Sequence, residues 1–117
     1  WSSDVCSSDL VLVPGDMGTA SYVMAGPSSG TNRAFGSSCH GAGRAMSRTE
    51  ARQKIDGAKV KRELADKGVA IYETNEKYLS EEAPDAYKNI DDVINLTEKA
   101  GLARPVARLK PLIVIKG

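Results

Sequence analysis

The sequence has little of several residue types, and each shortage excludes a class of protein. Only 5% of its 117 residues are aromatic, and it holds one histidine and two cysteines. Two cysteines cannot build a disulfide-rich scaffold, and no apolar run approaches the roughly 18 residues of a membrane-spanning helix. Neither sign of charge dominates, with 16 basic against 15 acidic side chains, and 41% of the residues are hydrophobic. The composition therefore predicts a soluble globular chain without a membrane partner.

The first ten residues differ in character from the rest. They are rich in serine, have no helical or strand periodicity, and change abruptly into the apolar residues 11–13. Back-translation fits TGG AGT TCA GAC GTG TGC TCT TCC GAT CT, a sequencing-library adapter read in frame. We therefore expect residues 1–10 to be an adapter-derived artefact, the alternative being a genuine polar tail. Without Cys6, Cys39 has no partner for an internal disulfide, which favours the cytoplasm as compartment.

Glycine and other turn residues divide the remaining chain into short elements. Apolar runs predict strands at residues 11–13, 20–25, 69–72, 105–107 and 112–115. Helical spacing and capping residues predict helices at 41–55, 58–66 and 91–100, with a capped helical turn starting at Ser80. A long loop, 27–38, precedes the first helix. The interleaved elements predict the α/β class, with a mixed β-sheet and flanking helices.

The only histidine lies in the most informative segment, residues 36–44, which reads Gly-Ser-Ser-Cys-His-Gly-Ala-Gly-Arg. The predicted helix would place His40 beside free N–H groups that attract a phosphate, and Gly41 and Gly43 would allow close approach. Arg44 and Arg48 add positive charge. A neutral imidazole there can act as a nucleophile toward phosphorus or as a general acid or base. The residues alone support a phosphate site, and a structural histidine in a glycine-rich turn is the alternative.

Several further stretches accompany this segment. Residues 14–22 read Pro-Gly-Asp-Met-Gly-Thr-Ala-Ser-Tyr, and Ser47-Arg48 follow the histidine segment. Four more stretches complete the set, at 81–88, 103–109, 111–112 and 114–117. In order and spacing they resemble the RtcB family of RNA-splicing ligases, over essentially all of residues 11–117. The resemblance implies that residues 11–117 are a C-terminal fragment of the catalytic domain, an incomplete part of a larger single-domain ligase fold.

The resemblance also implies an activity. Members of this family are GTP- and manganese-dependent ligases that join an RNA 3′-phosphate, or a 2′,3′-cyclic phosphate after its hydrolysis, to a 5′-hydroxyl. His40 would be the catalytic residue, forming a covalent histidine–GMP; GMP then passes to the RNA 3′-phosphate and the 5′-hydroxyl displaces it. The substrate RNA could be a spliced tRNA or a broken RNA under repair, and the need for an activating protein partner stays open.

Carried over residue by residue, the family's pattern assigns further roles. Ser21 matches a serine that contacts guanine, Tyr87 an aromatic that packs on the base, and Lys116 a lysine that reaches it. Backbone amides of Gly41, Ala42 and Gly43 would meet the nucleotide phosphates, and Arg44 and Arg48 the RNA phosphates. The alternative for each of these residues is an ordinary structural role. Arg52, on the same predicted helix as Arg44 and Arg48, is interpreted only as part of a solvated face, because no matched motif includes it.

Asp16 and Cys39 lie within the matched segments but receive no binding role. Asp16 stands where some family members have serine, and its carboxylate is expected to accept turn amides instead. Cys39 is interpreted as structural, because one thiol and one histidine cannot fill a metal site. The family's manganese ligands lie upstream of the matched segments, so residues 11–117 are expected to supply none and to be inactive alone. The other hypotheses are a guanine-nucleotide or phosphate-binding module without catalysis and a structural fragment.

Overall fold

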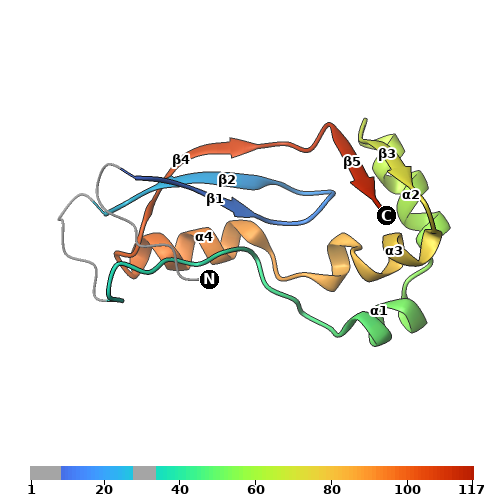
Figure 1. Cartoon of the computed structure of the whole chain (residues 1–117), viewed down its shortest axis with the longest axis horizontal. Helices are drawn as coiled ribbons and strands as arrows, with labels where there is room; N and C mark the ends of the chain where they lie inside the picture. Colours follow the sequence, from blue (N-terminus) through green and yellow to red (C-terminus); the bar gives the residue numbers. More distant parts are fainter. Residues whose placement is uncertain (1–8, 28–33) are drawn as a thin grey trace.

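Two small β-sheets organise the molecule. The computed structural model describes residues 9–27 and 34–117 (Figure 1). Strands β1 (Leu10–Pro14), β2 (Ser21–Ala25) and β4 (Arg104–Leu109) form an antiparallel sheet in the order β1-β2-β4. Strands β3 (Ala70–Glu73) and β5 (Ile113–Lys116) form a parallel pair. The predicted α/β class with flanking helices is confirmed, and its antiparallel and parallel pairings lie in separate sheets.

Some of the sequence predictions concern residues outside this description. Residues 1–8, most of the stretch interpreted as adapter-derived, are not among the described residues, and neither are 28–33 of the predicted long loop. All five predicted strands are present, with ends that differ from the predicted ones by a few residues at most. Within the described ranges, none of the helices has the length and apolar character needed to cross a membrane.

Two of the predicted helices are confirmed almost to the residue. Helix α2 (Gly57–Asp66) begins after Asp56, whose side chain accepts the Ala58 N–H. Helix α4 (Ile90–Lys99) begins after Asn89, whose side chain accepts two backbone N–H groups of the first turn. Each cap satisfies donors that have no partner within the helix, which is why these starts could be predicted from the sequence.

The predicted helix at 41–55 is wrong in its first half. Helix α1 spans only Arg48–Lys54, and Ser47 caps it by accepting the Glu50 N–H. The preceding residues instead bond to distant segments: the Ala42 N–H donates to Pro14, and the Ala45 and Met46 N–H groups donate to Ala86. Arg44 forms an antiparallel bridge with Tyr87. These long-range bonds replace the helical i→i−4 bonds that the apolar spacing had suggested.

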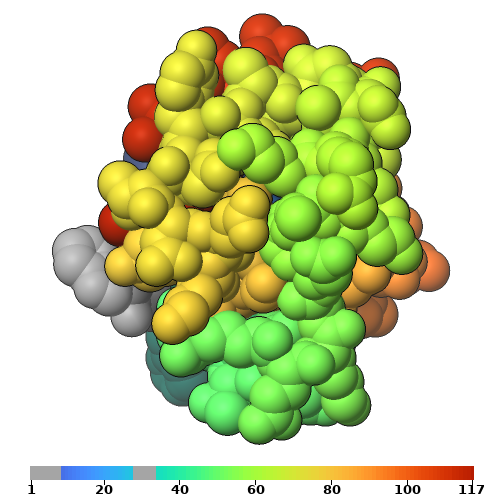
Figure 2. All heavy atoms as spheres, turned by 90° about the vertical axis from the view of Figure 1, so that its right-hand side faces the viewer, coloured from blue at the N-terminus to red at the C-terminus, as the bar shows by residue number. Residues whose placement is uncertain are grey.

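The predicted helical turn starting at Ser80 is also wrong. A helix that the sequence did not predict, α3 (Glu76–Glu81), is capped by Asn75 and ends at this point, so Ser80 is buried in its last turn. A short 3₁₀ helix, Pro84–Ala86, follows. With α1 and α2, α3 forms one end of the molecule, where the green and yellow surfaces adjoin in Figure 2.

Two clusters of buried side chains lie on either side of the β1–β2 turn. The first packs α4 against one face of the three-stranded sheet, through residues that include Val13, Met24 and Ile90. The second joins α2, α3 and β5, through residues that include Leu64, Leu79 and Val114. Met17 in the β1–β2 turn belongs to the second cluster, so this turn connects the two halves.

Candidate functional site

A cleft of about 590 Å³ lies at the junction of these two halves. Its lining comes from the β1–β2 turn, the segment before α1, the residues after α3, and β5. A volume of this size is typical of small-molecule sites. All of the site residues predicted from the sequence line it: Ser21, His40, Gly41, Ala42, Gly43, Arg44, Arg48, Tyr87 and Lys116.

His40 is exposed in the irregular segment that precedes α1, not at a helix start. The proposed contact between a phosphate and the first turn of a helix beside His40 is therefore wrong, since α1 begins only after Ser47. The segment is held from both sides, because the Ala42 N–H donates to Pro14 and the Lys88 N–H donates to Gly43. These bonds fix the backbone next to the imidazole.

Two glycines make this path of the chain possible. A Cβ at Gly41 would lie 3.1 Å from the Pro14 carbonyl oxygen, so a side chain would disturb the contact with β1. Gly43 has φ +73°, a conformation that side chains disfavour, and the space around its Cα is open. At Gly41 the group that approaches closely is the Pro14 carbonyl of the chain itself. At Gly43 the space is open, so a ligand can approach the backbone there.

Arg44 is tightly held next to Tyr87. Its Nε donates to the Met46 carbonyl at 3.0 Å and its Nη2 to the Glu81 carbonyl. Its Nη1 donates to the Tyr87 hydroxyl at 3.1 Å, and the guanidinium carbon lies 4.9 Å from the centre of the tyrosine ring. These bonds and the cation–π contact fix the orientation of the Tyr87 ring at the wall of the cleft.

The Glu82 carboxylate connects the charged residues of the cleft. Oε2 accepts a hydrogen bond from the Tyr87 hydroxyl and lies 3.8 Å from Lys116 Nζ. Oε1 lies 3.5 Å from Arg44 Nη1 and 3.5 Å from Arg48 Nε. Sequence reasoning included Glu82 in a family segment but gave it no role. One glutamate thus contacts four side chains that were predicted to bind nucleotide or RNA.

These contacts shift the pKa values of both partners. Burial acts to raise the pKa of Glu82, but the Tyr87 hydrogen bond and the charges of Lys116 and the two arginines outweigh it, so the pKa lies below its ordinary value. Burial, followed by the hydrogen bond to Glu82, raises the pKa of Tyr87, and Arg44 offsets part of that rise. At neutral pH the pair is therefore a carboxylate and a neutral phenol.

Arg48 is bound less firmly than Arg44. Its side chain is 61% exposed, and its contacts with Glu81 and Glu82 are ion pairs of 3.7 and 3.5 Å. Arg52, one helical turn further along α1, makes a shorter ion pair of 2.8 Å with Glu81. Glu81 thus fixes α1 to the end of α3, and Arg48 stays available at the rim of the cleft.

Asp16 and Cys39 have the roles that the sequence suggested. Asp16 Oδ1 accepts the Gly18 N–H at 2.8 Å, so the carboxylate stabilises the β1–β2 turn. Cys39 packs against the first core cluster, and its Sγ lies 3.3 Å from Thr97 Oγ1. Ser21 begins β2, and its hydroxyl accepts the Gly15 N–H at 3.5 Å.

The cleft offers donors for a nucleotide but no ligand set for a metal. Lysine, arginine and backbone N–H groups suit a polyphosphate, and the Tyr87 ring suits a base. In the part of the chain that the structure describes, no group of three or more His, Cys, Asp or Glu side chains is arranged to hold a metal ion. The described residues of the cleft therefore suit a nucleotide phosphate and a base.

Comparison with known proteins agrees with the motifs. A family model described as tRNA-splicing ligase RtcB matches residues 5–117. The tRNA-splicing ligase RtcB of Archaeoglobus fulgidus is 49% identical over 107 residues, which are 92% of this chain and 22% of that protein. The protein of the same name from Pyrococcus abyssi is 46% identical over 107 residues, or 92% of this chain and 12% of that protein. The chain thus spans less than a quarter of the length of these relatives.

Proposed function

The chain belongs to the RtcB family, and on that premise we propose that it is the nucleophile-bearing part of a GTP-dependent RNA ligase. The whole ligase would join an RNA 3′-phosphate, or a 2′,3′-cyclic phosphate after hydrolysis, to a 5′-hydroxyl. The observation that carries the proposal is the cleft, in which the exposed His40 shares one cavity with Tyr87, Arg48 and Lys116. The cytoplasm is the proposed compartment, in keeping with the free thiol of Cys39.

His40 would supply the covalent chemistry. An imidazole nitrogen attacks the α-phosphorus of GTP, a P–N bond forms, and the bond to the β-phosphate oxygen breaks as pyrophosphate leaves. An oxygen of the RNA 3′-phosphate then attacks the phosphorus of this GMP, so that a P–O bond forms and the P–N bond to His40 breaks, which releases the imidazole. Finally the 5′-hydroxyl oxygen attacks the 3′-phosphate, releases GMP and loses its proton to solvent, which completes the phosphodiester.

The neighbouring residues would bind and orient the reactants. Tyr87, held by Arg44 and Glu82, presents its ring to the base, while Ser21 and Lys116 contact guanine. The backbone at Gly41, Ala42 and Gly43 meets the nucleotide phosphates. Arg48, exposed at the rim, receives the phosphate of the RNA end, with Arg44 behind it.

Manganese is proposed as a cofactor of the whole ligase only. Metal ions neutralise charge on a phosphate under attack, which is the chemistry that manganese supplies in this family. The described residues of this chain offer no set of ligands for it, so no step is assigned to the metal here.

The test is guanylylation of His40. We expect α-labelled GTP to leave an acid-labile GMP adduct on an Archaeoglobus fulgidus ligase in which this chain's segment replaces the matched 107 residues. His40→Ala should abolish the adduct, whereas Asn95→Ala, an exposed change on α4, should leave it unchanged. The unsubstituted A. fulgidus ligase controls for loss of folding in the hybrid.

Two other outcomes would contradict the proposal. An adduct that persists in His40→Ala would remove the histidine from the role of nucleophile. Reversible retention of GTP without any adduct, in a hybrid that folds, would support a guanine-nucleotide or phosphate-binding module instead.

A further inference from the structure

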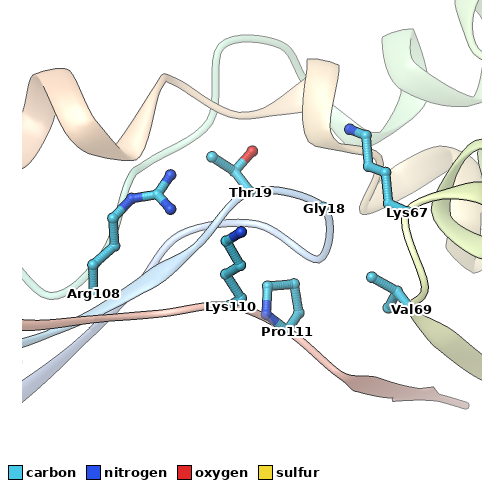
Figure 3. Close-up of a pocket in the computed structure, with 7 residues that line it drawn as sticks. All are labelled: Gly18, Thr19, Lys67, Val69, Arg108, Lys110 and Pro111. Atoms are coloured by element: carbon cyan, nitrogen blue, oxygen red, sulfur yellow. The ribbon is translucent and has the colours of Figure 1, made fainter.

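A second pocket lies beside the cleft and contains three cationic side chains. It has a volume of about 510 Å³, and Lys67, Arg108 and Lys110 line it together with Gly18, Thr19 and Pro111. Figure 3 shows Arg108 and Lys110 extending toward Thr19, with Lys67 on the other side of the pocket. We call it the basic pocket. No motif identified in the sequence assigns a function to these three cations.

Two of the three charges are not neutralised. Lys67 and Lys110 are exposed, and within residues 9–27 and 34–117 neither ammonium group has an ion-pair partner. Arg108 is paired with Asp91, to which Nε donates at 3.0 Å and Nη2 at 3.2 Å. This pairing fixes the guanidinium in place. The basic pocket therefore carries a net positive charge that an anion would neutralise.

The basic pocket adjoins the cleft that contains His40. Pro111 lines both cavities. The β1–β2 turn also lines both cavities. Asp16 and Met17 line the cleft, and Gly18 and Thr19 line the basic pocket. A chain molecule with its end in the cleft could therefore continue over Pro111 into the basic pocket without leaving the surface.

The lining suits a phosphate better than a base. Its polar groups are two ammonium groups, a guanidinium and the Thr19 hydroxyl, all of which can donate to phosphate oxygens. No aromatic side chain lines the pocket among the described residues, so a base would have no ring to stack on. Contacts of this kind position a nucleic acid without reading its sequence.

We propose that the basic pocket binds a backbone phosphate of the RNA strand whose end occupies the cleft. Lys67 and Lys110 provide the charge, and Arg108, fixed by Asp91, provides a directed donor. This inference rests on the proposed function for the identity of the ligand. Inorganic phosphate shares the chemistry, so the experiment must separate a polynucleotide from the free ion.

The experiment measures RNA binding as a function of salt concentration. Labelled single-stranded RNA with a 3′-phosphate is titrated with the full chain and with the hybrid ligase, and binding is followed by fluorescence anisotropy. Lys67→Gln with Lys110→Gln should reduce the slope of log K against log salt by about 0.7, since the pocket neutralises one phosphate and each neutralised phosphate on a single strand contributes about 0.7. The matched control, Lys59→Gln with Lys99→Gln, removes the same charge from exposed positions outside the pocket and should leave the slope nearly unchanged. Arginine at both pocket positions should restore it.

Specific results would overturn the inference. Equal losses in the pocket pair and the control pair would mean that only net charge matters. If inorganic phosphate shifts the Lys110 and Thr19 NMR signals while RNA binding is the same with and without the pocket lysines, the pocket is a site for the free ion. The GMP adduct on His40 is measured in parallel. If the adduct is absent but RNA binding depends on the pocket lysines, only the proposed function is contradicted. If the adduct is present but RNA binding does not depend on them, only this inference is contradicted.

Discussion

At the scale of single residues, Arg44 and Arg48 differ in what their guanidinium groups can still bind. Arg44 donates to two carbonyls and to the Tyr87 hydroxyl, so the protein itself uses most of its donors. Among the described residues Arg48 makes only long ion pairs, and its side chain is exposed. A phosphate arriving from solvent would therefore meet Arg48 first, while Arg44 acts through the ring of Tyr87 that it holds. The predicted contact of each arginine with RNA phosphate stays a prediction.

Replacing Glu82 by glutamine tests the carboxylate that connects these residues. Glu82→Gln keeps the shape but removes the charge, so the pKa of Tyr87 should fall, because Glu82 supplies two of the three effects that raise it. The pKa of Tyr87 can be followed through the ¹³Cζ shift of labelled tyrosine against pH. Glu76→Gln, an exposed change at the start of α3, the helix that ends just before Glu82, is the control. An unchanged titration of Tyr87 would mean that the two side chains are not bonded in solution.

Glu82 also makes stability depend on pH in a defined direction. Its pKa is lower in the folded chain than the ordinary value of 4.5, so folding favours the ionised form. The corresponding stabilisation is complete above the ordinary value and is lost as the pH falls through the lower, folded value. The difference in stability between the unchanged chain and Glu82→Gln should therefore shrink in acid.

At the scale of elements, what could be predicted depended on where each backbone hydrogen bond finds its partner. Helices α2 and α4 have local caps and an apolar face, and both were predicted from the sequence. Residues 41–46 have helical spacing too, but their N–H groups bond to Pro14 and Ala86, partners that no local pattern shows. The short α3 was missed because Ser80, a typical capping residue, lies at its end instead of its start.

The predicted site residues all line one cleft, although some of the elements that carry them were predicted wrongly, and their roles stay predictions. The family segments indicated residues that the fold brings into one cleft, even though the helix assumed to begin beside His40 is absent there. Glu82 was missed because its importance comes from four contacts with Arg44, Arg48, Tyr87 and Lys116. Such contacts depend on the folded positions of segments far apart in the chain.

The corrected start of α1 leads to a prediction about Ser47. If the helix begins there, Ser47→Ala removes the acceptor for the Glu50 N–H and should lower the free energy of unfolding by about 1 kcal/mol. Ser47→Asp keeps an acceptor and should cost much less. Urea denaturation of the full chain measures both. A helix continuous from residue 41 would place Ser47 in its interior, and the alanine variant would then be neutral or more stable.

At the scale of the whole molecule, the three-stranded sheet has one covered and one open face. Helix α4 packs on one side, and among the described residues the other side carries no further layer (Figure 1). Strand β1 shows the contrast directly, because Leu10 and Leu12 are 68% and 71% exposed while Val13 is fully buried. Alternate residues of a strand point to opposite faces, so the open face is apolar. This agrees with the exposed apolar surface that a part of a larger fold is expected to have.

Substitutions within β1 can distinguish side chains on the open face from side chains in the core. Val13→Ala should lower the free energy of unfolding by roughly 2 kcal/mol, because it leaves a cavity beneath α4. Leu10→Thr with Leu12→Thr should change it by less than about 0.5 kcal/mol, since these side chains gain little from folding. The threonine pair should instead reduce the fluorescence of a hydrophobic dye bound to the folded chain, which Val13→Ala should leave unchanged. If the threonine pair destabilises the chain as strongly as Val13→Ala, Leu10 and Leu12 are buried in solution, and the open face is covered by another part of the chain or by a second copy of it.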